Sequence, residues 1–142
     1  MYEVTSETAA GRDAAWAALV GVSEWPRWTK SMTSVEPLED GPLRVGSRVR
    51  IKQPGMPTMV WEVTVLRDGE EFTWASRSPG LRTVGSHRIV VDDHGTVRLV
   101  LGLEQTGPLA KLVWALTGAR TRRFVDMEAR GLAAASEARS AQ

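Results

Sequence analysis

The sequence predicts an α+β fold in which seven antiparallel strands wrap around one long C-terminal helix. Two observations lead to this prediction. Short segments that alternate between apolar and polar residues occupy the middle of the chain, and Asp-Gly or Pro-Gly turns separate them. A helical stretch that begins after Gly107 then continues to about residue 138, and Pro108 suits its first position.

The chain is expected to begin with a strand and a helix. Residues 2–8 alternate between two faces, which is typical of a half-buried strand. Residues 11–20 are predicted to be helical, because Trp16, Leu19 and Val20 recur at the spacing of one helix face.

A second short helix is predicted over 24–28, within the stretch SEWPRWTKSM that holds two of the six tryptophans. Pro26 is tolerated there, because the amides of a first helical turn have no partner within the helix. Trp25 and Trp28 then share one face. Two interpretations remain open: both indoles pack the end of the sheet onto the long helix, or one of them, preferably Trp25, lines and gates a pocket.

Six further strands follow, at about 31–37, 46–53, 58–67, 70–78, 81–92 and 95–106. No linker, repeat or low-complexity segment interrupts the chain, so residues 1–142 are expected to form a single domain. The last residues, 139–142, are expected to fray.

Turn chemistry predicts which side chains face the helix. The turns at 68–69, 79–80 and 93–95 set the pairing of the strands that they join, and the first is taken as a two-residue turn that pairs Val65 with Phe72. Residues directly opposite each other share a face of the sheet. The face toward the helix is therefore predicted to carry Trp61, Val63, Val65, Phe72, Trp74, Ser76, Thr83, Gly85, His87, Ile89, Leu99, Leu101 and Leu103.

Composition excludes several classes of function. The chain has 18 basic and 17 acidic residues, and this balance argues against a nucleic-acid binder. There is no Cys and there are two His, so neither a metal site nor a cofactor is expected. We see no signal peptide and no apolar stretch near the ~20 residues that span a bilayer, which favours a cytoplasmic bacterial protein.

The order of elements and five stretches resemble the START/helix-grip (SRPBCC) superfamily, and most closely its bacterial polyketide cyclase/dehydrase and lipid-transport branch. The stretches are EWPRWTKSM, VGSRVRIKQPGMP, FTWASRSPG, SHRIVV and EARGL. The resemblance covers nearly the whole chain. It implies a curved sheet that grips the helix around an internal apolar cavity. Members include lipid carriers, hormone receptors and aromatase/cyclases.

The predicted ligand-binding residues come from this inner face and its neighbours: Trp25, Trp61, Phe72, Trp74, Ser76, Thr83, Gly85, His87, Leu101 and Phe124. Gly85 lies opposite Trp74, and a glycine there leaves room for an indole or a ligand. The run Arg120, Arg122 and Arg123 is expected to be a solvated helix face, and no local motif marks an inward arginine.

His87 is the one candidate catalytic residue. It lies among apolar neighbours, so its pKa is expected to fall below about 6.5. It is either a hydrogen-bonded core histidine, a ligand contact or a general base. A catalytic triad is not expected, because no Asp or Glu falls on the inner face of the sheet.

Three functions remain open. The first is binding or carriage of a hydrophobic small molecule, such as a lipid, polyketide or aromatic metabolite. The second is a polyketide cyclase or dehydratase with His87 as base, and with Ser76, Thr83 or an arginine orienting the substrate. The third is protein interaction through the apolar residues 108–118, which either pack at the cavity mouth or form a patch for a homodimer or a lipid surface.

Overall fold

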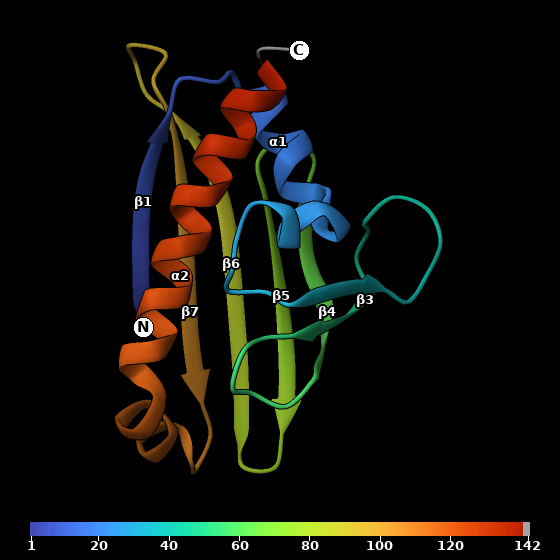
Figure 1. Cartoon of the computed structure of the whole chain (residues 1–142), viewed down its shortest axis with the longest axis vertical. Coiled ribbons are helices and arrows are strands. Elements are labelled where there is room, and N and C mark those ends of the chain that lie inside the picture. Colours follow the sequence, from blue (N-terminus) through green and yellow to red (C-terminus); the bar gives the residue numbers. More distant parts are fainter. Residues whose placement is uncertain (141–142) are drawn as a thin grey trace.

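The strands form one antiparallel sheet in the order β1-β7-β6-β5-β4-β3-β2, which places the first strand of the chain beside the last (Figure 1). This computed structural model describes residues 1–140. The predicted α+β class is confirmed, as is the pairing of each later strand with the next. The strands are β1 (Tyr2–Thr8), β2 (Ser34–Pro37), β3 (Arg48–Lys52), β4 (Met59–Arg67), β5 (Glu71–Ser78), β6 (Leu81–Val91) and β7 (Val97–Thr106).

The long helix α2 (Ala110–Ser140) crosses one face of this sheet, next to β1 and β7 (Figure 1). Its buried side chains are small or branched, which lets the helix approach the strands closely: Val125, Ala129, Leu132 and Ala133. Arg139 and Ser140, which were expected to fray, continue the helix. The rest of the predicted fraying, at residues 141–142, lies outside the described residues.

Strand β1 is tied to α2 by side chains as well as by packing. The Tyr2 hydroxyl donates a hydrogen bond of 2.6 Å to Asp126 Oδ1, and the Thr8 hydroxyl donates one of 3.1 Å to the carbonyl of Ala133. These two contacts lie at opposite ends of the strand. The edge of the sheet that β1 forms is therefore fixed to the helix at both ends.

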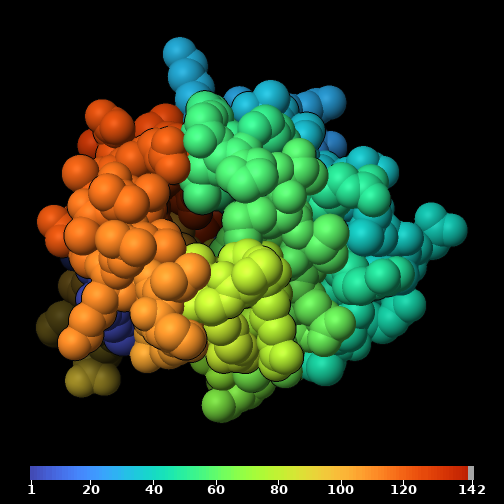
Figure 2. Space-filling model, turned by 90° about the horizontal axis from the view of Figure 1, so that it is seen from below, coloured from blue at the N-terminus to red at the C-terminus, as the bar shows by residue number. Residues whose placement is uncertain are grey.

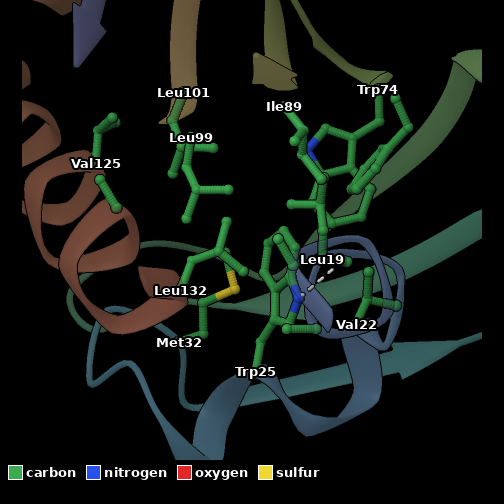
Figure 3. Packing of buried hydrophobic residues seen from close by; sticks show 14 of the residues in the cluster. Leu19, Val22, Trp25, Met32, Trp74, Ile89, Leu99, Leu101, Val125 and Leu132 are labelled. Carbon is green, nitrogen blue, oxygen red and sulfur yellow. Dashed lines mark hydrogen bonds between the residues drawn. The ribbon is translucent and has the colours of Figure 1, made fainter. Parts of the chain in front are cut away.

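Helix α1 (Arg12–Val20) and the 3₁₀ helix η1 (Val22–Arg27) cover one end of the sheet (Figure 1). η1 begins two residues earlier than predicted. It holds Trp25 1 % exposed, and the indole Nε1 donates a hydrogen bond of 3.1 Å to the carbonyl of Leu19 (Figure 3). Trp25 is thus fixed in the core, between η1, α2 and the sheet.

Gly131 brings α2 close to Trp28. A Cβ atom at position 131 would lie 2.5 Å from the Trp28 carbonyl oxygen and 2.7 Å from an indole carbon. The glycine therefore permits close contact between the helix and the residue that follows η1. The second tryptophan of the pair packs on α2, as one of the two interpretations of SEWPRWTKSM proposed.

The predicted strand register is confirmed on two hairpins and wrong on the third. Trp74 pairs with Gly85, and His87 pairs with Leu101, as expected. At the β4–β5 turn, however, Arg67 pairs with Glu71, so the loop has three residues and not two. Within that loop Gly69 takes a left-handed φ of 76°.

An irregularity between Val63 and Val65 then restores the register further along β4. Val63 pairs with Trp74 as predicted, but Val65 pairs with Thr73 and is 40 % exposed. Leu66 takes the inward position that the sequence analysis assigned to Val65. The error arose because an Asp-Gly pair favours a two-residue turn, whereas here the left-handed Gly69 serves a longer loop followed by a β-bulge.

Candidate functional site

A cavity of about 280 Å³ lies between α2 and the inner face of the sheet. It opens at the end of the molecule where the start of α2 meets the β3–β4 segment and the β5–β6 turn. Figure 2 shows this mouth as a hollow between the orange, green and yellow-green segments. Met56 and Pro57, Ser78 and Leu81, and Val113 line it from these three sides.

Seven of the ten predicted ligand-binding residues line the cavity: Trp61, Trp74, Thr83, Gly85, His87, Leu101 and Phe124. The other three, Trp25, Phe72 and Ser76, lie behind its wall, each at most 3 % exposed. Phe72 stacks on the imidazole of His87 with 4.2 Å between ring centroids. Ser76 pairs with Thr83, and the longer threonine side chain is the one that reaches the cavity.

The proposed gating role of Trp25 is not supported by its position. Its indole is enclosed by other rings, with centroids 5.3 Å from Trp74 and 5.5 Å from both Trp28 and His87. A gate must move at low cost, but this ring is buried and hydrogen-bonded through Nε1 to Leu19. Trp25 supports the cavity wall from behind.

Trp61 and Trp74 form the aromatic part of the wall. Their ring centroids are 5.9 Å apart on the neighbouring strands β4 and β5. Gly85 lies opposite Trp74, and a Cβ atom there would come within 3.0 Å of the indole Nε1. The glycine therefore makes room for the indole of Trp74, which can then present an apolar surface to the cavity.

His87 is neutral over most of the pH range. Its Nδ1 lies 3.1 Å from the carbonyl of Phe72, and because a carbonyl only accepts, Nδ1 carries the proton. Burial lowers the pKa of His87 to about 4, against a smaller opposing effect of this hydrogen bond. The direction agrees with the prediction from its apolar neighbours. Nε2 is left without a proton and can accept one.

Glu128 on α2 is a cavity residue that the sequence analysis missed. It lines the same cavity as His87 and accepts a hydrogen bond of 3.1 Å from the hydroxyl of Ser31. Burial raises the pKa of Glu128 to about 7, and the hydrogen bond from Ser31 lowers it by less. The absence of acidic residues from the inner face holds for the sheet, but the helix supplies one.

Arg120 is half-buried and not fully solvated as expected. It lines the cavity near the mouth, and its Nη1 donates a hydrogen bond of 3.2 Å to the carbonyl of Gly55 in the β3–β4 segment. Arg122 and Arg123 are exposed as predicted, and the Arg122 guanidinium lies over the rings of Tyr2 and Trp114.

A signal for both missed residues was present in the sequence. Phe124 was expected to face inward, and residues four positions before and after it on a helix share its face. Those positions are Arg120 and Glu128. Charged residues were assumed to be solvated, which is the common case but fails where a helix face borders a cavity.

The first turns of α2 expose a row of leucines beside the mouth. Leu109, Leu112 and Leu116 are 43 %, 57 % and 76 % exposed, whereas Trp114 is half-buried under Arg122. The apolar stretch 108–118 was expected either to pack at the cavity mouth or to form an exposed patch, and it does both. Val113 lines the mouth, and the leucines form a patch outside it.

Within residues 1–140, no three His, Asp or Glu side chains cluster as they would around a metal ion. None of the helices in this part of the chain has the length and apolar character needed to cross a membrane.

The chain is similar to one protein family in sequence and to several solved structures in fold. A family model described as polyketide cyclase/dehydrase and lipid transport matches residues 1–137. The ZhuI aromatase/cyclase from Streptomyces sp. R1128 superposes with a TM-score of 0.81 at 19% identity, covering 97% of this chain and 93% of that one. No curated protein matches the chain in sequence.

Two other solved structures have the same fold. TTHA0849 from Thermus thermophilus superposes with a TM-score of 0.72 at 19% identity, covering 97% of both chains. The hypothetical protein jhp0584 from Helicobacter pylori gives a TM-score of 0.78 at 18% identity, covering 95% of this chain and 85% of that one. These likenesses establish the fold of the sheet and its helix.

Proposed function

The chain belongs to the polyketide cyclase/dehydrase and lipid-transport family of the helix-grip superfamily, and from this premise we propose that it binds a hydrophobic small molecule in the cavity beneath α2. Candidate ligands are a lipid, a polyketide or an aromatic metabolite. The observation that carries the proposal is the cavity itself, which has an open mouth and walls that include Trp61, Trp74, Leu101 and Phe124.

The size of the cavity limits the ligand. Its volume of about 280 Å³ lies just below the roughly 300–1,000 Å³ typical of small-molecule sites. A well-packed core of this size would leave few voids larger than a water molecule. A retained space of this volume beside two tryptophans therefore supports a ligand of modest size with an apolar body.

A neutral fluorescent probe tests this proposal. N-phenyl-1-naphthylamine should bind saturably and quench tryptophan emission by energy transfer. Trp74→Ala should reduce that quenching and weaken probe binding, because this indole lines the cavity beside Trp61. Trp16→Ala is the matched control: Trp16 lies on α1 and donates a hydrogen bond to Asp68, so its loss should leave probe affinity unchanged.

A second variant covers the case in which Trp74→Ala fails to fold. Leu103→Trp places an indole into the cavity from β7 and should block the probe while the protein remains folded. Circular dichroism checks the fold of each variant. Saturable binding that survives Leu103→Trp, or no saturable binding to the folded wild type, would rule out the proposed binding function.

A cyclase or dehydratase activity is the second candidate, and the presence of His87 and Glu128 in the same cavity favours it. At pH 7 a pKa of about 4 leaves the imidazole of His87 without its extra proton. At the same pH a pKa of about 7 leaves about half of the molecules with a protonated Glu128 carboxyl group. Two titratable groups whose pKa values are reversed from their usual order can divide the roles of base and acid.

In such a reaction His87 Nε2 would take a proton from a carbon between two carbonyl groups, and the resulting carbanion would attack another carbonyl of the same chain to form a carbon–carbon bond. The alkoxide would take the proton back from His87 and become a hydroxyl group. His87 would then remove the second proton from the same carbon to form a C=C bond, while the hydroxyl leaves as water with the proton of Glu128. His87→Gln should then lower turnover of a poly-β-keto substrate by roughly 10²–10⁴-fold. The same variant should change probe affinity by less than about tenfold, the worth of one ordinary hydrogen bond. Equal turnover in variant and wild type would exclude His87 as the base.

A further inference from the structure

Two buried polar atoms near the cavity have no partner. Among the described residues, Arg120 Nε and Gln105 Oε1 are the buried side-chain atoms that make no hydrogen bond. Both residues line the cavity. An unsatisfied buried donor or acceptor is costly, and few occur in native proteins. Arg120 Nε is a donor that lacks an acceptor, and a ligand bound in this cavity can supply one.

Arg120 is arranged to receive an acceptor with two oxygens. Its Nη1 already donates to the carbonyl of Gly55, which fixes the plane of the guanidinium against the β3–β4 segment. The ion pairs found in residues 1–140 do not include this arginine. The Nε side therefore remains for a partner, and a guanidinium edge matches a carboxylate with two parallel hydrogen bonds.

The surroundings of the mouth favour a negatively charged partner. Within residues 1–140, two residues with charged side chains line the cavity, and they are Arg120 near the mouth and Glu128 deeper in. The carboxyl group of Glu128 also faces the cavity, but it lies eight residues further along α2, roughly 12 Å at 1.5 Å per residue. The charged group nearest the mouth is therefore the cationic guanidinium of Arg120.

We propose that the ligand of this cavity is an amphipathic acid whose carboxylate binds Arg120, beside Gln105, at the mouth. Its apolar body lies deeper, against Trp61, Trp74 and Phe124. The proposal rests on the binding function proposed above and adds the chemical class of the ligand. A single guanidinium neutralises one carboxylate, whereas a phosphate dianion would keep a second charge. The NH₂ group of the Gln105 amide can donate to the same carboxylate, whereas its unpaired Oε1 accepts only and is not partnered by the head group.

Two ligands of equal chain length separate this proposal from simple apolar binding. Decan-1-ol leaves water more readily than decanoate at pH 7.5, so an apolar cavity alone would prefer the alcohol. If Arg120 binds the head group, the wild-type protein should bind decanoate at least tenfold more tightly than decan-1-ol. Isothermal titration calorimetry measures both affinities directly, without the fluorescent probe.

Variants at two arginines show which residue causes the preference for decanoate over decan-1-ol. Arg120→Gln should weaken decanoate binding at least tenfold and change decan-1-ol binding by less than twofold. Arg120→Lys keeps the charge but loses the planar fork, so it should bind decanoate with intermediate affinity. Arg123→Gln removes the same charge from an exposed position one turn along α2 and should leave the preference for the acid unchanged.

The outcomes distinguish this proposal from the one on which it rests. If the neutral probe binds but decan-1-ol binds as well as decanoate, the acid head group is excluded and the apolar cavity remains. Equal losses in Arg120→Gln and Arg123→Gln would indicate general charge attraction and would likewise overturn the head-group site. If the probe, the acid and the alcohol all fail to bind the folded protein, the binding function itself is wrong.

Discussion

At the scale of single residues, burial has opposite effects on the two titratable groups of the cavity. Burial disfavours the charged form of each, which lowers the pKa of His87 to about 4 and raises that of Glu128 to about 7. Relative to the unfolded chain, the folded protein therefore binds fewer protons at His87 and more at Glu128. The two groups make opposing contributions to the pH dependence of stability.

The effect of Glu128 can be isolated with Glu128→Gln. Between pH 4.5 and about 7 the folded wild type holds the proton of Glu128 while the unfolded chain has lost it, so stability falls as pH rises. The variant lacks this loss. Its free energy of unfolding, measured in urea, should rise relative to wild type by up to about 3 kcal/mol between pH 4.5 and 8. Glu70→Gln, at an exposed loop position, is the control. A difference that does not change with pH would contradict the buried position of the carboxyl group.

At the scale of secondary-structure elements, β4 tests how turn length determines which side chains are buried. The three-residue loop and the irregularity that follows exchange the positions of two adjacent residues. Val65 is exposed, and Leu66 packs against the core. Without the longer loop, the alternation of the strand would place them the other way round.

A matched pair of substitutions decides between the two registers. Val65→Ser should change the free energy of unfolding by less than about 0.5 kcal/mol, as surface changes do. Leu66→Ala should cost roughly 2 kcal/mol, toward the low end for a core leucine because Leu66 is only partly buried. Chemical denaturation of both variants measures the difference. The reverse order of costs would mean that the two-residue turn predicted from the sequence is present after all.

The strand register also shows which parts of the cavity could be predicted from the sequence alone. Glycine-containing turns fixed the pairing of Trp74 with Gly85 and of His87 with Leu101, because their geometry allows few alternatives. The sheet side of the cavity could therefore be predicted. The helix side could not, since a helix shows its buried face only through apolar residues. Arg120 and Glu128 interrupt that pattern while facing inward.

At the scale of the whole molecule, the cavity has a polar group at each end and an apolar middle. Arg120 and Gln105 stand near the mouth, and His87 and Glu128 provide titratable groups deeper in. Trp61, Trp74 and Phe124 lie among them. A ligand that is oriented by its head group would bring its opposite end toward the imidazole and the carboxyl group. The proposed binding and the proposed proton transfers would thus use the same orientation of the ligand.

The pairing of β1 with β7 has a consequence for the order in which the chain can fold. During synthesis the strands β2 to β6 can pair with their neighbours as they leave the ribosome, but β1 must wait for a partner that comes about ninety residues later. The helix α2, which closes the cavity, is made last. Until then Trp61 and Trp74 lack the cover of α2, a state prone to aggregation. The addition of β7 and α2 therefore both completes the sheet and closes the cavity, and a small apolar molecule present at that moment would be enclosed as the protein folds.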